Sequence, residues 1–121
     1  MEPSHRPTEI ALHRDRRLLE ITFADGARFE LPCEYLRVYS PSSEVAGYHR
    51  KRPVLQVGKA EVNISDIVQV GHYAVKLCFD DGHTGGLYTW DYLYDLGANY
   101  DRHWADYLAR LERAGARRQP D

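Results

Sequence analysis

An aspartate and a histidine flank one tight turn in the second half of the chain, and this pair could transfer a proton. Asp80 and His83 lie on either side of Asp81-Gly82, a residue pair able to adopt the positive φ angles of a β-hairpin turn. If the turn has two residues, the carboxylate faces the imidazole and could serve as a general base or a recognition point. No nucleophile accompanies the pair, so a solvated hairpin tip is the competing interpretation.

A second polar group surrounds Pro41. Arg37, Ser40 and Ser42 could offer a guanidinium and two hydroxyls to an anion or to a peptide carboxylate. Serines also cap helices and form turns, so a purely structural role is the alternative. The basic run at residues 49–52 could bind phosphate, but 16 Lys and Arg against 18 Asp and Glu give a net charge of -2. We therefore expect no nucleic-acid binding.

The remaining candidate ligands do not predict a metal site. His13 and Asp15 imitate part of a non-haem iron triad, but that chemistry needs a second histidine in a large barrel, so His13 is interpreted as a strand-end residue. His72 and Cys78 would lie roughly 20 Å apart along one strand. Cys33 and Cys78 are the only cysteines and are expected to be reduced thiols.

The elements that position these groups are short strands joined by tight turns. Val75, Leu77 and Phe79 alternate with polar or small neighbours, which is the period of a half-buried strand. Trp90 and Leu93 follow at helical spacing behind Thr89, a suitable helix N-cap. The strands expected in this way cover residues 8–12, 18–23, 28–31, 62–70 and 73–79, with a further strand around residue 88.

The two halves of the chain repeat one pattern of strand, Asp-Gly turn, strand and helix. Phe23 and Asp25-Gly26 in the first half correspond to Phe79 and Asp81-Gly82 in the second. The second copy is one residue longer, and an insertion near residues 85–86 could mark a β-bulge. Chance similarity between such degenerate patterns is the alternative.

Length and composition predict a single domain. The 121 residues are 43% hydrophobic and 28% charged, which is ordinary for a globular protein. An apolar stripe over residues 101–114 predicts an amphipathic C-terminal helix. We predict an α+β domain over residues 8–114, with a twisted, mostly antiparallel sheet of five or six strands, two short helices and this C-terminal helix. Residues 1–7 and 115–121 are expected to be flexible.

Aromatic residues are crowded toward the C-terminal half of the sequence. The chain has nine Tyr, two Trp and three Phe, and such side chains suit positions where one edge is packed and the other meets solvent or a partner. Tyr92 and Tyr94 cannot both share a narrow inward face with Trp90 and Leu93. We therefore predict an exposed aromatic patch at this helix as a partner surface.

Three sequence blocks, at residues 36–45, 67–75 and 79–93, together resemble the gamma-butyrobetaine-hydroxylase-like N-terminal domain family. The resemblance extends over about residues 10–96 and implies a small, mainly antiparallel domain with short helices. It implies that relatives occur alone in bacteria, as the N-terminal part of carnitine-pathway dioxygenases, and fused to P-loop ATPases of iron-sulfur cluster assembly.

The resemblance also implies a zinc site in the dioxygenase relatives, formed by a Cys-x-Cys-x-x-Cys run and by a histidine in an Asp-Gly-His turn. The matching positions here are Ser40, Ser42, Val45 and His83. Serine hydroxyls are poor zinc ligands and valine is none. We predict that no zinc or other cofactor binds, an expectation that elemental analysis of protein purified without chelator tests.

These observations favour a non-enzymatic binding or adaptor domain. The resemblance implies a protein partner, an iron-sulfur assembly ATPase or a client. The polar N-terminus and the absence of a long apolar run indicate a cytoplasmic protein without membrane contact. The alternative is a small ligand-binding protein or enzyme that uses Asp80, His83 and Arg37. No P-loop signature is present, so ATPase activity would come from another protein.

Overall fold

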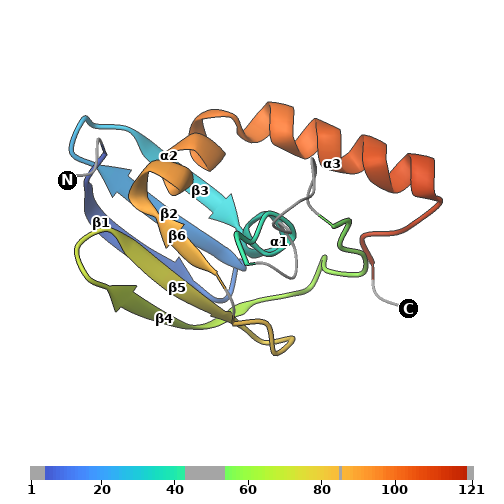
Figure 1. The fold of residues 1–121 in the computed structure, drawn as a ribbon, viewed down its shortest axis with the longest axis horizontal. Helices are drawn as coiled ribbons and strands as arrows, with labels where there is room; N and C mark the ends of the chain where they lie inside the picture. The colour runs from blue at the N-terminus through green and yellow to red at the C-terminus, as the bar shows by residue number, and fades with distance from the viewer. Residues whose placement is uncertain (1–4, 43–53, 85, 120–121) are drawn as a thin grey trace.

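The computed structural model describes residues 5–42, 54–84 and 86–119. These residues form two three-stranded antiparallel sheets and three helices (Figure 1). In chain order the elements are β1 (Pro7–His13), β2 (Leu18–Phe23), β3 (Arg28–Pro32), α1 (Cys33–Val38), β4 (Ile64–Val70), β5 (Ala74–Phe79), β6 (Leu87–Thr89), α2 (Trp90–Ala98) and α3 (Tyr100–Ala114). The α+β class is confirmed, and His13 ends a strand as expected.

The strands form two sheets rather than the single sheet of five or six strands that the sequence predicted. The sheet orders are β1-β2-β3 and β4-β5-β6. Consecutive strands joined by short turns pair at low entropic cost. A single sheet would need an additional pairing between strands of the two halves, across the long segment that separates α1 from β4.

The inward faces of both sheets contribute to one hydrophobic core. Leu19 and Ile21 on β2, and Leu77 and Phe79 on β5, are buried at alternating positions, which is the period of a strand with one packed face. α2 contacts both β3 and β6 and so lies across one side of the two sheets (Figure 1). No helix of the described residues is long and apolar enough to cross a bilayer.

The repeat seen in the sequence is present in the structure, because each half folds as three antiparallel strands followed by a helix. In the first hairpin the Phe23 N–H donates to the Ala27 carbonyl, and in the second the Phe79 N–H donates to the His83 carbonyl. Gly26 and Gly82 have φ angles of 93° and 91°. Three residues therefore separate the closing pair of each hairpin, as in a type I turn followed by a left-handed glycine. The proposed insertion at residue 85 lies outside the described residues.

The tyrosines bind backbone carbonyls of the protein itself. Five hydroxyls donate to main-chain oxygens: Tyr35 to Leu96, Tyr39 to His103, Tyr88 to Leu36, Tyr92 to Tyr39, and Tyr107 to Gln56. The acceptors on Leu36, Tyr39 and Leu96 lie in or just after the last turns of α1 and α2, where carbonyls lack a helical partner. The tyrosines therefore satisfy helix ends inside the core.

The expectation of an exposed aromatic patch at Tyr92 and Tyr94 was wrong. Both residues are half-buried. The Tyr94 hydroxyl donates to Asp25 at 2.7 Å, and its ring stacks on His5 with 3.7 Å between centroids. The rings are drawn inward because each hydroxyl has an acceptor on a neighbouring element. A role of these two residues in partner binding stays a prediction.

Residues 115–119, which the sequence suggested would be flexible, make defined contacts with the domain. Gly115 ends α3 in a left-handed conformation. Arg118 then donates two hydrogen bonds to Glu34, at 2.9 and 2.7 Å, and its guanidinium lies 5.2 Å from the Trp104 ring centroid. Bidentate pairing and cation–π contact together hold the tail against α1 and α3.

Candidate functional site

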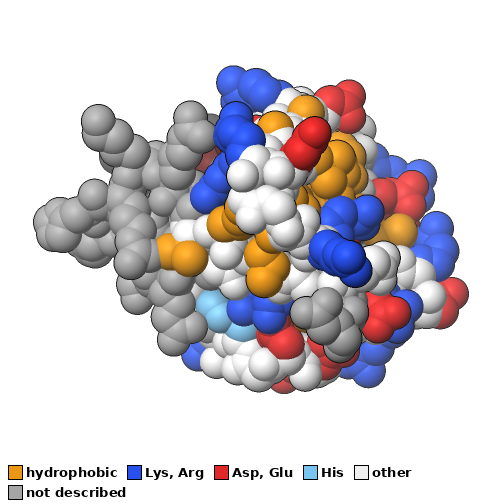
Figure 2. All heavy atoms as spheres, turned by 90° about the vertical axis from the view of Figure 1, so that its right-hand side faces the viewer, with side chains coloured by type: hydrophobic (Ala, Val, Ile, Leu, Met, Phe, Trp, Pro, Cys, Tyr) orange, Lys and Arg blue, Asp and Glu red, His pale blue; other side chains and the backbone are white. Residues whose placement is uncertain are grey.

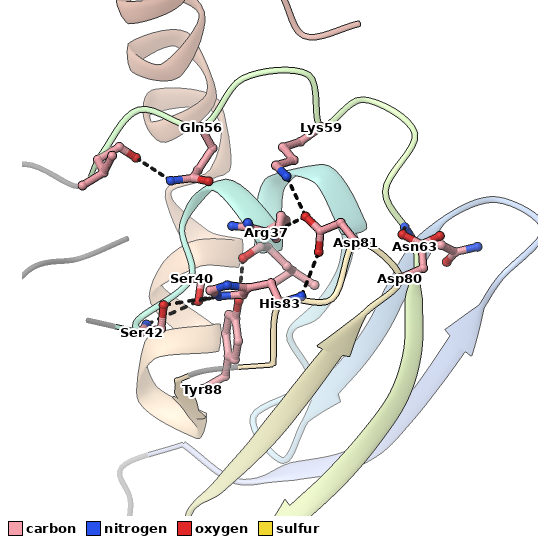
Figure 3. A network of polar contacts seen from close by, with 12 residues as sticks. Arg37, Ser40, Ser42, Gln56, Lys59, Asn63, Asp80, Asp81, His83 and Tyr88 are labelled. Atoms are coloured by element: carbon pink, nitrogen blue, oxygen red, sulfur yellow. Dashed lines mark hydrogen bonds and ion pairs between the residues drawn. The ribbon is translucent and has the colours of Figure 1, made fainter. Parts of the chain in front are cut away.

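Three buried side chains converge where the β5–β6 hairpin meets the end of α1 (Figure 3). The Nε2 atom of His83 lies 2.8 Å from the Ser40 Oγ and 3.3 Å from the Ser42 Oγ. All three residues are at least nine-tenths buried. The imidazole is therefore held by hydroxyl groups inside the protein rather than at a solvated hairpin tip.

A glycine allows the hairpin to approach the serines. Gly86 has a φ angle of 88°, and a Cβ at this position would lie 2.6 Å from the Ser42 nitrogen. No side chain larger than hydrogen fits there without a shift of the backbone. The Ser42 N–H in turn donates to the Ser40 Oγ at 3.3 Å.

An ion cluster lies beside the three side chains and shares the same hairpin. The Oδ2 of Asp81 accepts from Arg37 Nε at 2.8 Å and from Lys59 Nζ at 2.7 Å. Its Oδ1 accepts from the His83 backbone N–H at 3.1 Å. Burial raises the pKa of Asp81, but the hydrogen bonds from Lys59, His83 and Arg37 outweigh it and bring the pKa to about 2. Asp81 is thus ionised at neutral pH and anchors both cations.

One nitrogen of this cluster has no acceptor among the described residues. Arg37 is 7% exposed, and its buried Nη1 atom forms no hydrogen bond with the part of the chain that the structure describes. Buried donors are nearly always paired, and an unpaired one points to a water or a ligand that completes the site.

The structure brings together Arg37, Ser40, Ser42 and His83, as the sequence suggested, but not Asp80. The predicted face-to-face pair of Asp80 and His83 was wrong, because the turn has three residues and Asp80 belongs to it. The Asp80 carboxylate instead accepts from the Asn63 N–H at 3.1 Å. The cluster also contains Asp81 and Lys59, which sequence reasoning missed. Asp81 was read only as a turn residue, and nothing in the spacing links it to Lys59.

The low pKa of Asp81 predicts acid sensitivity. Because its folded-state pKa lies below the ordinary value of 3.8, ionised Asp81 adds stability that is present above about pH 4 and lost as the pH falls through about 2. Urea unfolding midpoints measured from pH 6 to pH 2 should fall more steeply in this window for the natural protein than for Asp81→Asn. Parallel profiles would contradict the assignment.

The sequence model of a family described as gamma-butyrobetaine hydroxylase-like, N-terminal, matches residues 10–94 of the chain. The chain belongs to this family. The resemblance inferred from the sequence blocks is thereby confirmed. None of the curated proteins matches the chain.

Three solved structures are similar to this chain. Two proteins with NMR solution structures are 48% and 51% identical, with TM-scores of 0.84 and 0.83; the matches cover 97% and 99% of this chain and 92% of each of those chains. A crystal structure from Acidithiobacillus ferrooxidans is 39% identical over 77% of this chain and 93% of that one, with a TM-score of 0.64. That protein is described as having unknown function and belonging to the DUF971 family.

The residues at the positions where the family resemblance implies a zinc site do not fit zinc. Ser40, Ser42 and His83 do meet in space, as their correspondence to metal ligands predicts, while Val45 lies outside the described residues. They supply one imidazole and two neutral hydroxyls, whereas zinc in proteins selects thiolate, imidazole and carboxylate ligands. No group of three His, Cys, Asp or Glu in the described parts of this family member could hold a metal. That no zinc binds stays a prediction.

Proposed function

We propose that this protein is a non-enzymatic binding module that acts through a protein partner. The observation that carries the proposal is that the buried polar side chains of this protein contact one another inside the domain. His83 is 7% exposed and its ring contacts two serines. A general base must reach a substrate proton, and this imidazole faces the protein interior.

The titratable neighbours of the cluster are equally unsuited to catalysis. Asp81, with a pKa of about 2, is too weak a base to accept a proton near neutral pH. Burial raises the pKa of the Cys33 thiol to about 11, which keeps this cysteine protonated and unreactive. These properties support a structural role for the cluster.

The partner that we propose is a P-loop ATPase of iron-sulfur cluster assembly or one of its client proteins. Support comes from the family resemblance, in which this domain is fused to such ATPases, and from the absence of a P-loop motif in this chain. The face shown in Figure 2 carries cationic, anionic and hydrophobic side chains interspersed, and the net charge is -2. Such a surface favours specific protein contact over bulk electrostatic attraction.

A second candidate function is the binding of a small acceptor ligand at Arg37. The unpaired, buried Nη1 atom supports it, because a carboxylate or a water molecule would supply the missing acceptor. This ligand would lie beside Ser40 and His83, within the same cluster.

Calorimetric titration of the purified protein into a purified P-loop ATPase of iron-sulfur cluster assembly, and into client apoproteins, tests the proposal. We expect a saturable complex, and His83→Ala should bind with the same affinity once its fold has been checked by NMR. Ser42→Ala is the substitute if His83→Ala does not fold. Absence of any complex would refute the adaptor role. Binding of a small carboxylate that both variants abolish would support the second candidate.

A further inference from the structure

A groove lies between the outer edge of β1 and the turn that joins β4 to β5. Its volume is about 1050 Å³, just above the range for ligand clefts, roughly 300–1,000 Å³. β1 and β4 are both edge strands, since each pairs with one neighbour among the described elements. The groove therefore has a strand edge on either side. Its lining includes the charged residues Arg6 and Glu9, together with Ile10, Gln69, Tyr73 and Trp90.

The hydrogen-bonding pattern shows which backbone groups of β1 face the groove. The Phe23 N–H points to β3, because it donates to the Ala27 carbonyl. The N–H and C=O groups of successive residues point to opposite sides of an antiparallel strand. Those of Thr22 therefore point toward β1, where Thr22 pairs with Glu9. By the same alternation the N–H and C=O of Ile10 point away from β2, toward the groove. The N–H and C=O of Leu12 also point away from β2, because Leu12 is two residues further along β1.

The opposite edge is partly closed by side chains. The Ile67 N–H, which points outward from β4 by the same alternation, donates to the Asp66 Oδ1 at 2.9 Å. The Ser65 carbonyl accepts from Arg14 at 2.7 Å. Such capping is one way in which proteins protect edge strands from unwanted pairing. The described contacts show no equivalent protection of Ile10 on β1. β1 is thus the edge that can accept a further strand.

Side chains around the groove define what that strand must look like. Ile10 packs against the core and, with Trp90, provides an apolar floor, while Tyr73 is 47% exposed at the rim. Glu9 points to the opposite face of β1 from Ile10, is exposed, and forms no ion pair with a described residue. A strand that pairs with β1 therefore needs apolar side chains facing the floor and, between them, a cation facing Glu9.

We propose that β1 binds an extended segment of a partner protein by strand addition, with apolar residues at alternate positions and a Lys or Arg opposite Glu9. Main-chain hydrogen bonds to Ile10 and Leu12 give affinity, and the alternating side chains give specificity. The proposal rests on the binding-module function, and it names the surface and the partner segment that this function uses.

NMR titration of the 15N-labelled full chain tests the proposal with a capped synthetic peptide of the repeating sequence Lys-Val, three repeats long. Saturable shifts should be centred on the amides of Ile10, Leu12 and Gln69, and amide exchange at Ile10 and Leu12 should slow. Tyr73→Ala and Glu9→Lys should each weaken binding by about fivefold, the size of one cross-strand pair. Leu108→Ala and Glu112→Lys are the controls, because they truncate a similarly exposed apolar side chain and reverse a glutamate charge on α3, and they should bind as the natural protein does.

The proposal is overturned if no saturable binding occurs, or if a Glu-Val peptide binds as tightly as the Lys-Val peptide. It is also overturned if Tyr73→Ala and Glu9→Lys bind as tightly as the natural protein. A peptide with three lysines followed by three valines controls for composition, and its equal binding would also contradict strand addition. The same two variants in the calorimetric titration with the ATPase separate the two proposals. If both variants bind the ATPase normally, the groove assignment fails and the adaptor function stands. If the natural protein forms no complex, the adaptor function itself fails.

Discussion

Replacing Asp81 with alanine is expected to lower the free energy of unfolding by about 3–5 kcal/mol, because it leaves the Arg37 guanidinium buried without its counter-ion. The Arg37 side chain is 9% exposed and its Nε is bound to Asp81 at 2.8 Å. The same substitution removes the acceptor of the His83 N–H. Such a loss is a large fraction of the total stability of a small domain.

Urea denaturation monitored by circular dichroism measures this loss, and the internal repeat supplies a matched control. Asp25 holds the equivalent place in the first hairpin, where its carboxylate accepts from the Ala27 N–H, but it pairs with no arginine of the described residues. Asp25→Ala should therefore be much less destabilising. The double variant Arg37→Met and Asp81→Ala should recover part of the loss, since the buried guanidinium is then removed together with its counter-ion. Equal effects of Asp25→Ala and Asp81→Ala would show that the ion cluster adds nothing.

The local elements of the fold were predictable because they depend on short-range patterns. Alternation at Leu19 and Ile21, and again at Val75 and Leu77, marks strands that bury one face, and the helical spacing behind Thr89 marks α2. The number of sheets was not predictable in this way. It depends on whether edge strands of the two halves meet, and no local pattern records that contact.

The candidate site was predictable only in part, for a similar reason. The meeting of Ser40, Ser42 and His83 followed from the family resemblance, which carries information about distant contacts. The ion cluster joins Arg37, Lys59 and Asp81 from three separate segments, and a charged residue in a loop or turn gives no sign of its partner. The half-buried position of Tyr92 was not predictable because its hydroxyl donates to a backbone carbonyl, a group that every residue carries.

The two copies of the repeated unit make different side-chain contacts at the same backbone turn. Both hairpins use the same backbone bonds and the same Asp-Gly turn. The residue that closes the turn is Ala27 in the first copy and His83 in the second. Asp25 accepts from Tyr94, whereas Asp81 binds two cations. The polar cluster therefore forms only at the second hairpin, where that hairpin meets the end of α1.

Gly86→Ala should be the most disruptive glycine substitution near the cluster. Two costs add: a non-glycine residue at a φ of 88° is strained by about 1–3 kcal/mol, and the new Cβ would lie 2.6 Å from the Ser42 nitrogen. The atoms in the way belong to the backbone around Pro41 and Ser42, which cannot rotate aside. Overpacking of this kind costs about 1–3 kcal/mol more.

Gly82→Ala carries the first cost alone, because Gly82 has a φ of 91° but no atom within 4 Å of the new Cβ; the difference between the two variants therefore measures the second cost. Both variants should lower the urea midpoint, and Gly86→Ala should lower it further, by the equivalent of about 1–3 kcal/mol. The His83 ring signals should shift in Gly86→Ala, since displacement of Ser42 changes the contact at Nε2. Equal midpoints for the two variants would mean that the hairpin is not pressed against the end of α1, and the convergence of Ser42 with His83 would then lose its support.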